Sequence, residues 1–471
     1  MSLETLATDA YQLTTLVAHA DAGRLAHRVA MAFFFRRLPK ARNYVVFCGL
    51  RSLLEHARSM SFDRAELEML RTHPILGPAL QARPAVLEAL RTLDGFEGEI
   101  DALPEGTLSF AGPGTRTDGS PLQVGGLPVA IYTPLLQVRT DLVRAKLIET
   151  PWLARINHLS MVASKAARVA DAAGDKPVLE FGQRRTHPAA AVDAAYAAYL
   201  AGCAGTSNLA AQFRHGIPAS GTMDHFYVQA AEQAGRPIAE SETEAFAAFA
   251  RAFPGASTLL VDTYDTERGI RNGVRATAGK LSGVRLDSNV NPQSVARARA
   301  LLDELGAPHA KIFCSDGLDE YRVRELRELG DGFGVGENIT CSPDSAVGVG
   351  AVAKVVVNGY GKVTMKICRG SGKATLPGQL QVYRFGDHDL VALDSEAPPS
   401  GGKPLLQPVW RGRAAVAELP ALEQSRAYVK AQLAALPTEV RALEPAKTPW
   451  PLVASDGLVA KIEALVKEAV G

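Results

Sequence analysis

The sequence lacks an excess of charge of either sign. Its 51 lysines and arginines nearly balance 50 aspartates and glutamates, which leaves a formal net charge of +1. A protein that binds nucleic acid or an anionic membrane through its whole surface usually carries a basic excess. The composition therefore gives no reason to expect a nucleic-acid or membrane partner.

Long hydrophobic runs and paired cysteines are also missing. The longest apolar candidate, residues 346–357, is interrupted by Lys354 and is too short to span a membrane. Residues 1–9 show no basic region followed by an apolar core, so we expect no signal peptide. The five cysteines are scattered, without a Cys-x-x-Cys pair, as is typical of reduced thiols. We therefore expect a cytoplasmic protein.

The chain does contain enough apolar material for a large core. Hydrophobic residues make up 47% of its 471 residues, and this length allows two or three domains. Residues 1–150 combine helices with short strands, and residues 151–350 alternate strands with helices. Residues 351–471 return to strands before two amphipathic helices. We predict that this last segment completes the β-rich domain that the first segment begins.

The strands of the middle segment are short and almost wholly apolar. Such strands are buried on both faces, which is typical of a parallel sheet. Helical patterns fill the gaps between them, so the segment is predicted to be an α/β barrel or a doubly wound sheet. The predicted strands lie at residues 178–181, 200–204, 217–219, 258–261, 283–286, 311–314 and 332–335.

Polar residues and glycines follow these strands at consistent positions. In repeated βα folds, the loops after the strands carry the chemistry, because the C-terminal ends of parallel strands meet on one face. We therefore predict an active-site mouth on that face. In strand order, its residues are Arg184 and Arg185; Thr206, Ser207 and Asn208; Thr222 and His225; Asp262 and Asp265; Arg285, Asp287 and Ser288; Ser315, Asp316 and Gly317; and Gly334 and Gly336.

The residue types in this mouth favour a phosphorylated, anionic small molecule. Glycine turns let backbone N–H groups approach phosphate oxygens, and arginine binds phosphate or carboxylate through two parallel hydrogen bonds. Aspartates beside phosphates indicate Mg²⁺ or ribose hydroxyls, and Asp262 is a candidate Mg²⁺ ligand. Two carboxylates in a barrel mouth would also fit a glycosidase, but the arginines and glycines argue against that alternative.

His225 has two interpretations. A lone histidine is usually a hydrogen-bonded structural residue. However, His225 directly precedes a helical pattern that starts at Phe226, and a helix N-terminus stabilises phosphate. A histidine at that position can carry a phosphoryl group covalently. The aromatic residues Tyr11 and Phe181 are more often core than substrate-stacking residues, and spacing alone selects neither.

An ordered set of motifs resembles the nicotinate phosphoribosyltransferase family over nearly the whole chain. The most specific are Glu180-Phe181-Gly182-Gln183-Arg184-Arg185, Gly205-Thr206-Ser207-Asn208 and Gly221-Thr222-Met223-Asp224-His225. Each motif alone would be weak evidence, whereas the order makes the set specific. The others lie at residues 8–14, 47–50, 164–169, 261–266, 283–288 and 373–378.

The resemblance implies an irregular α/β barrel and a β-rich domain built from both chain ends, in a homodimer with shared active sites. It implies a reaction that joins nicotinate to 5-phosphoribosyl 1-pyrophosphate and releases pyrophosphate, with Mg²⁺ as cofactor. It also implies coupled ATP hydrolysis through a phosphohistidine.

The resemblance also implies roles for individual residues. His225 would be the phosphohistidine and Asp287 would act beside it in catalysis. Tyr11, from the partner subunit, and Phe181 would sandwich the pyridine ring, while Thr222 and Arg285 would hold its carboxylate. The phosphoribosyl and magnesium site would be lined by Arg184, Asp287, Asp316 and Gly317, with a phosphate turn at Gly334 and Gly336.

Two positions depart from the family pattern. Asn289 and Val290 follow the Arg-Leu-Asp-Ser motif where the family usually has Gly-Asp, and Glu337 follows the phosphate turn where the family usually has threonine. Relatives that use nicotinamide place an aspartate where this chain has Ser207. The alternatives to nicotinate phosphoribosyl transfer are a nicotinamide-using relative and a catalytically diverged family member.

Overall fold

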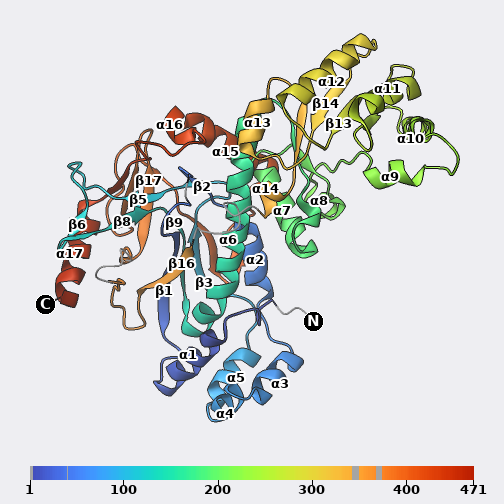
Figure 1. Cartoon of the computed structure of the whole chain (residues 1–471). Helices are drawn as coiled ribbons and strands as arrows, with labels where there is room; N and C mark the ends of the chain where they lie inside the picture. The colour runs from blue at the N-terminus through green and yellow to red at the C-terminus, as the bar shows by residue number, and fades with distance from the viewer. Residues whose placement is uncertain (1–3, 40, 342–349, 368–373, 471) are drawn as a thin grey trace. The chain divides into compact units, whose positions relative to one another are not determined.

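A computed structural model describes residues 4–39, 41–341, 350–367 and 374–470 (Figure 1). The chain divides into two compact units, Met1–Met161 with Val347–Gly471, and Val162–Ala346. Lys373, the first residue of the last motif, lies outside the described residues. Among the described helices, none combines the length and the apolar character needed to cross a membrane.

The first unit is β-rich and combines both chain ends, as predicted. Its largest sheet has the order β16-β1-β9-β3-β20-β21. Its second strand, β1 (Arg28–Phe35), pairs antiparallel with β9 (Pro134–Asp141) and with the edge strand β16 (Ala351–Val357), so blue and orange segments lie side by side in Figure 1. The remaining strands of this sheet are β3 (Gly98–Ala102), β20 (Gln407–Gly412) and β21 (Ala414–Ala415).

A second sheet of this unit has the order β19-β17-β18-β22. Its strands are β17 (Leu380–Arg384), β18 (Asp389–Leu393), β19 (Lys403–Pro404) and β22 (Leu452–Ala454). Three short antiparallel pairs join β2 (Val45–Val46) to β4 (Leu108–Ser109), β5 (Ala111–Pro113) to β8 (Ala130–Tyr132), and β6 (Gln123–Val124) to β7 (Leu127–Pro128). The helices of the first unit are α1 (Ala10–Asp21), α2 (Leu50–Ser59), α3 (Arg64–Thr72), α4 (Leu76–Gln81), α5 (Pro84–Arg91), α15 (Leu422–Ala435), α16 (Thr438–Arg441) and α17 (Asp456–Val470).

A buried histidine lies in the core of this unit. The Nδ1 atom of His56 accepts a hydrogen bond from the Trp152 indole N–H at 3.0 Å, so the ring must be neutral at that atom. Burial, together with the charge of Arg155, lowers the pKa of His56 to about 4. The unfolded chain therefore binds a proton at a higher pH than the folded chain does.

We expect the first unit to lose stability as the pH falls from about 6.5 towards 4. The pKa of His56 is lower in the folded protein than in the unfolded chain, so the free energy of unfolding is highest above the unfolded-chain pKa of about 6.5. As the pH falls towards 4, that free energy decreases by at most about 3 kcal/mol. Urea unfolding at several pH values, followed by tryptophan fluorescence, measures the free energy of unfolding of the first unit, because all three tryptophans lie in this unit. His56→Gln should remove this part of the pH slope, whereas the exposed His309→Ala should keep it. Equal slopes in all three proteins would contradict the assignment.

The second unit contains a parallel sheet, as its apolar strands predict. The order is β11-β10-β15-β14-β13-β12, and every pair is parallel. The last strand, β15, pairs with the first, β10, so the array closes on itself except between β11 and β12. The bounds are β10 (Val178–Glu180), β11 (Gly205–Thr206), β12 (Thr258–Leu260), β13 (Gly283–Leu286), β14 (Lys311–Cys314) and β15 (Gly332–Val335). This arrangement is an irregular α/β barrel.

Helices follow the strands, and several begin at a capping side chain. Asn208, Asp224, Asp265, Asn291 and Asp319 each accept a backbone N–H from the first turn of the next helix. The helices are α6 (Leu142–Ala173, which begins in the first unit), α7 (Pro188–Leu200), α8 (Leu209–His215), α9 (His225–Ala230), α10 (Ile238–Ala252), α11 (Thr266–Ala276), α12 (Pro292–Glu304), α13 (Glu320–Leu326) and α14 (Glu337–Thr340).

Two predicted strands of this unit are wrong. Leu200 is the last residue of α7, whose alanine-rich sequence is apolar because the helix is buried on most sides. The strand that follows is only Gly205–Thr206. Residues 217–219 form a single bridge, Thr206 to Ala219, because Pro218 has no N–H to extend a ladder and only its carbonyl oxygen accepts a hydrogen bond.

Candidate active site

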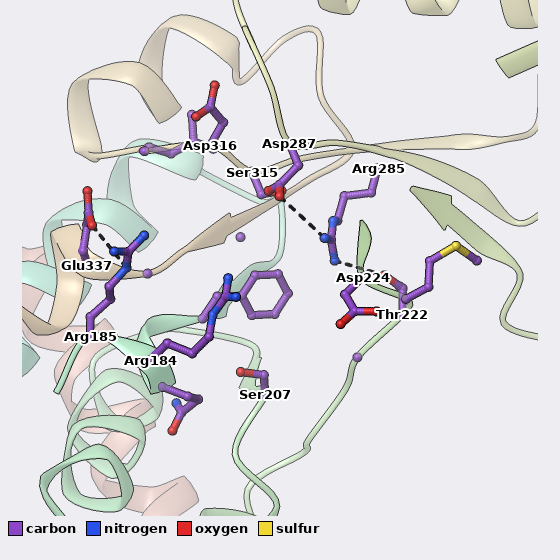
Figure 2. Close-up of a pocket in the computed structure, with 18 of the residues that line it drawn as sticks. Arg184, Arg185, Ser207, Thr222, Asp224, Arg285, Asp287, Ser315, Asp316 and Glu337 are labelled. Carbon is purple, nitrogen blue, oxygen red and sulfur yellow. Dashed lines mark hydrogen bonds and ion pairs between the residues drawn. The ribbon is translucent and has the colours of Figure 1, made fainter. Parts of the chain in front are cut away.

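A cavity of about 910 Å³ opens at the C-terminal ends of the parallel strands (Figure 2). Its lining comes from the loops after β10, β11, β13, β14 and β15, together with the segment before α9 and the end of α10. All of these residues belong to the second unit. Many residues of the predicted mouth therefore surround one concave site at the expected ends of the strands.

Most of the predicted site residues line this cavity. They are Phe181, Arg184, Arg185, Ser207, Thr222, Arg285, Asp287, Ser315, Asp316, Gly317, Gly334 and Gly336. His225 and Asp262 contact lining residues without lining the cavity themselves. Tyr11 belongs to the first unit, where the residue is 51% exposed and Lys146 Nζ lies 5.6 Å from the ring centroid.

One wall of the cavity is the ring of Phe181, which lies against a glycine. A Cβ atom built on Gly334 would lie 2.5 Å from both Cδ2 and Cε2 of that ring, and 3.1 Å from Phe313 Cε1. The Phe181 and Phe313 rings lie 6.0 Å apart. Gly334 thus lies against the aromatic wall rather than only in a phosphate turn, and its lack of a side chain makes room for the ring.

Arg285 lies between a hydroxyl and a carboxylate. Its Nη1 donates to Thr222 Oγ1 at 3.2 Å and its Nη2 lies 3.7 Å from Asp287 Oδ2, as Figure 2 shows. The side chain is only 15% exposed, and its Nε is buried without a hydrogen-bond partner in the described part of the chain. A guanidinium that is held but incompletely paired is suited to a ligand carboxylate.

His225 begins α9, and both of its ring nitrogens face polar groups. Nδ1 lies 3.1 Å from Thr263 Oγ1, and Nε2 lies 3.6 Å from Asp287 Oδ2. Asp224 caps the same helix by accepting the N–H of Tyr227 at 3.0 Å. Asp287 therefore links His225 to Arg285 and to the cavity.

Asp262 supports the loop of Asp287 instead of lining the cavity. Its Oδ2 accepts the backbone N–H of Asp287, and burial raises the pKa of its carboxyl group. Its Oδ1 is buried without a hydrogen-bond partner among the described residues. No group of three or more acidic, histidine or cysteine side chains in the described chain is arranged to hold a metal. A Mg²⁺ ion held by one or two carboxylates and by ligand phosphates would not need such a group.

The loop after β14 is conformationally strained at the cavity. Asp316 has a φ of 105°, a region that residues with a side chain rarely adopt, and Gly317 follows at 58°. Asp316 Oδ2 accepts the Val290 N–H at 3.4 Å, and Ser315 Oγ donates to Asp287 Oδ1. The loops after β13 and β14 are thus tied together, and Asp316 and Gly317 both line the cavity.

The structure accommodates both departures from the family pattern. Asn289 has a φ of 52°, and asparagine is among the residues that best replace glycine in this left-handed region. Val290 is buried. The Glu337 carboxylate is paired with Arg185 at 3.3 Å, so it does not lie unpaired beside the glycine turn (Figure 2).

Several lining residues were not predicted. Tyr227, Phe249 and Phe253 form an aromatic flank of the cavity, with Phe249 and Phe253 ring centroids 5.0 Å apart. Their spacing on α9 and α10 is that of ordinary core residues, so the sequence carries no signal for them. Asn338 directly follows Glu337 and could have been included on that ground.

Comparisons with known proteins agree with one another over most of the chain. The family model described as the nicotinate phosphoribosyltransferase N-terminal domain matches residues 6–157, and the nicotinate phosphoribosyltransferase family model matches residues 177–388. Nicotinate phosphoribosyltransferase pncB2 of Mycobacterium tuberculosis is 36% identical over 475 residues, covering 98% of this chain and 93% of the relative. The Bacillus subtilis nicotinate phosphoribosyltransferase is 34% identical, covering 83% and 76%. The crystal structure of human nicotinic acid phosphoribosyltransferase superposes with a TM-score of 0.79 at 27% identity, covering 97% of this chain and 99% of that one.

Proposed function

The chain belongs to the nicotinate phosphoribosyltransferase family, and from this premise we propose that it joins nicotinate to 5-phosphoribosyl 1-pyrophosphate in NAD biosynthesis. The products are nicotinate mononucleotide and pyrophosphate. The observation that carries the proposal is a single cavity that combines the Phe181 ring, the incompletely paired Arg285 and the Arg184 and Asp316–Gly317 region. This arrangement matches a flat anionic ring at one end and a phosphorylated sugar at the other.

The base end of the cavity orients nicotinate. Phe181 provides an aromatic face for the pyridine ring, and Gly334 leaves the space that this position of the ring requires. Arg285, steadied by Thr222, pairs with the carboxylate of nicotinate. These contacts point the pyridine nitrogen towards the sugar, which lowers the entropy cost of the reaction.

The transfer is a displacement at the anomeric carbon. The nitrogen lone pair of nicotinate forms a bond to C1 of the ribose while the C1–oxygen bond to pyrophosphate breaks, and pyrophosphate leaves with that electron pair. Positive charge develops on the sugar, as in other oxocarbenium-like reactions. We assign the Asp287 carboxylate to stabilise that charge, and Arg184 to bind the phosphates.

Asp287 and Asp316 are the residues that would hold Mg²⁺. Both line the cavity, and Mg²⁺ commonly binds one or two carboxylates together with substrate phosphates. The ion would neutralise charge on the pyrophosphate leaving group. Asp262 would act indirectly, by holding the Asp287 backbone.

We assign His225 to couple ATP hydrolysis to synthesis. With Nδ1 donating to Thr263 Oγ1, the Nε2 lone pair is available to attack the γ-phosphorus of ATP, forming phosphohistidine as ADP leaves. Hydrolysis of this intermediate by water gives phosphate and restores the imidazole. The position of Nε2 beside Asp287 supports a link between the two reactions.

We also propose a homodimer with shared active sites. Tyr11 is half exposed in the first unit, although it belongs to a motif that resembles the family's base-stacking tyrosine. Leu209, Phe213 and Phe226 are 74%, 95% and 76% exposed in the second unit, which is unusual for apolar side chains and typical of an interface. Mixing Tyr11→Ala with Phe181→Ala subunits should restore activity, because one site of the heterodimer keeps both rings. No recovery after subunit exchange would contradict shared sites.

An assay of the purified protein tests the proposed function. Nicotinate or nicotinamide is offered with phosphoribosyl pyrophosphate and Mg²⁺, with and without ATP. Nicotinate should be preferred by at least about tenfold, or 1.4 kcal/mol, because Arg285 favours the anion and Ser207 provides no carboxylate to hold an amide. Equal use of both bases would favour the nicotinamide alternative, and no turnover would favour a diverged family member.

Glu337→Thr is expected to lower the KM for phosphoribosyl pyrophosphate by up to about fivefold. The substitution releases Arg185 from its ion pair and removes a negative charge near the phosphates. The effect is small because an exposed ion pair contributes only about 0.2–1 kcal/mol. Glu304→Thr breaks a similarly exposed pair with Arg271 away from the cavity and serves as the control. An unchanged or higher KM in Glu337→Thr would show that the pair does not restrain Arg185.

A further inference from the structure

A buried carboxylate lies directly behind the aromatic wall. Glu180 is the last residue of β10, its side chain is fully buried, and it immediately precedes Phe181. No described cation forms an ion pair with it. A carboxylate is seldom buried without a cation unless hydrogen bonds satisfy its oxygens, because desolvation is costly.

The hydrogen bonds of Glu180 come from two different loops. Its Oε1 accepts the backbone N–H of Gly182, and its Oε2 accepts from the Gln183 amide. Thr206 Oγ1, at the end of β11, also donates to Oε2, at 2.7 Å. The backbone carbonyl of Glu180 accepts the N–H of Ser207 at 3.1 Å. Glu180 thus holds residues on both sides of the base-binding wall.

The surrounding contacts make this arrangement rigid. Asn208 donates to the Gln183 side chain, and its own N–H donates to Thr206 Oγ1 at 3.1 Å, which joins the two loops a second time. A Cβ atom on Gly182 would lie 2.4 Å from Thr340 Oγ1, so that turn fits only glycine. A displacement of the Glu180 carboxylate would therefore be transmitted to both Phe181 and Ser207.

We propose that Glu180 is a positioning residue that fixes the Phe181 ring and Ser207 relative to each other, and thereby sets the preference for nicotinate over nicotinamide. The inference rests on the proposed function. Glu180 does not line the cavity, so it acts through the two residues that do. Its carboxylate is the acceptor that both loops share.

Glu180→Gln and Thr206→Val each test the proposal. The first replaces one accepting oxygen with a donor, and the second removes the hydroxyl that donates to it. Each should raise the KM for nicotinate about tenfold and narrow the nicotinate-to-nicotinamide ratio, with the KM for phosphoribosyl pyrophosphate changing less than about twofold. Thr206→Ser, which keeps the hydroxyl, should restore wild-type values. The Glu180→Gln/Thr206→Val double variant should be no worse than the worse single variant, since both break one network.

A matched control separates positioning from general damage to the fold. Glu242 is another buried carboxylate of the same unit, bonded to Asn272 Nδ2 at 2.7 Å and absent from the cavity lining. Glu242→Gln should leave both KM values and the base preference unchanged. Wild-type turnover is measured first, and its failure would refute the proposed function rather than this inference. If the wild type is active, the role of Glu180 would be overturned by KM values and a base preference in Glu180→Gln and Thr206→Val that match those of Glu242→Gln. Equal rises in the KM for nicotinate and in the KM for phosphoribosyl pyrophosphate would overturn it as well.

Discussion

Replacing Gly334 by alanine is expected to lower kcat/KM for nicotinate by about a hundredfold, mainly through KM. The added methyl group would lie 2.5 Å from two atoms of the Phe181 ring, well inside contact distance, and 3.1 Å from Phe313. The Phe313 ring lies close to both the added methyl group and the Phe181 ring and blocks movement in its direction. The Phe181 ring must therefore move into the space that the pyridine requires. A misplacement of about 1 Å in a binding site costs about a hundredfold in rate, equivalent to about 2.7 kcal/mol.

The cavity offers a matched control for this substitution. Gly221 lines the same cavity, and a Cβ atom on it would meet nothing within 4 Å. Gly221→Ala should therefore change kcat/KM by less than about threefold. In a Phe181→Ala background, Gly334→Ala should have little further effect, because the ring that it displaces is gone. A full additional loss in that background would place the role of Gly334 elsewhere, for example at the phosphate.

The second large effect is expected for His225→Ala, which should abolish the ATP-dependent part of synthesis and the coupled release of phosphate. Weak synthesis without ATP should remain, because the imidazole contacts Asp287 and Thr263 and does not form the sugar–nitrogen bond. The variant removes the only nucleophile that we assign to the phosphoryl group. Steady-state rates with and without ATP, and phosphate release, measure both parts.

Two further variants define the role of His225. Thr263→Val removes the partner that orients the ring and should reduce ATP stimulation without abolishing it. His309→Ala, at an exposed position, should behave as wild type. Undiminished ATP stimulation in His225→Ala would refute the phosphohistidine assignment and leave His225 as a structural residue.

The sequence predicted those parts of the second unit that depend on local pattern. β13, β14 and β15 match their predicted bounds because each is an apolar run between turn residues. Polar residues at their C-terminal ends meet in one cavity because parallel strands place those ends together. The directions of individual side chains carry no such local signal. Asp262 turns towards the Asp287 backbone, and Gly334 meets Phe181 from a distant part of the chain.

Local pattern also failed where tertiary contacts override it. Residues 200–204, directly before β11, have the hydrophobicity of a buried strand, yet Leu200 is the last residue of the buried helix α7. The sequence of residues 362–367 also predicts a strand, because it is rich in β-branched residues. In the structure this segment forms no strand, and Val363 makes an isolated bridge to Val357. In both cases the backbone hydrogen bonds of the segment do not extend into a ladder along the predicted length, and a sequence pattern cannot reveal that.

The pairing of β1 with both β9 and β16 has a consequence for synthesis of the chain. β9 follows β1 by about 100 residues, but β16 follows it by about 300, after the entire second unit. At about 5–20 residues per second, one edge of β1 waits on the order of 15–60 s for its partner. That edge carries the run Phe33-Phe34-Phe35, which is fully buried in the finished protein. An unpaired apolar edge invites pairing with other chains, so this strand exposes the nascent protein to aggregation until β16, which ends at Val357 of the 471 residues, has been made.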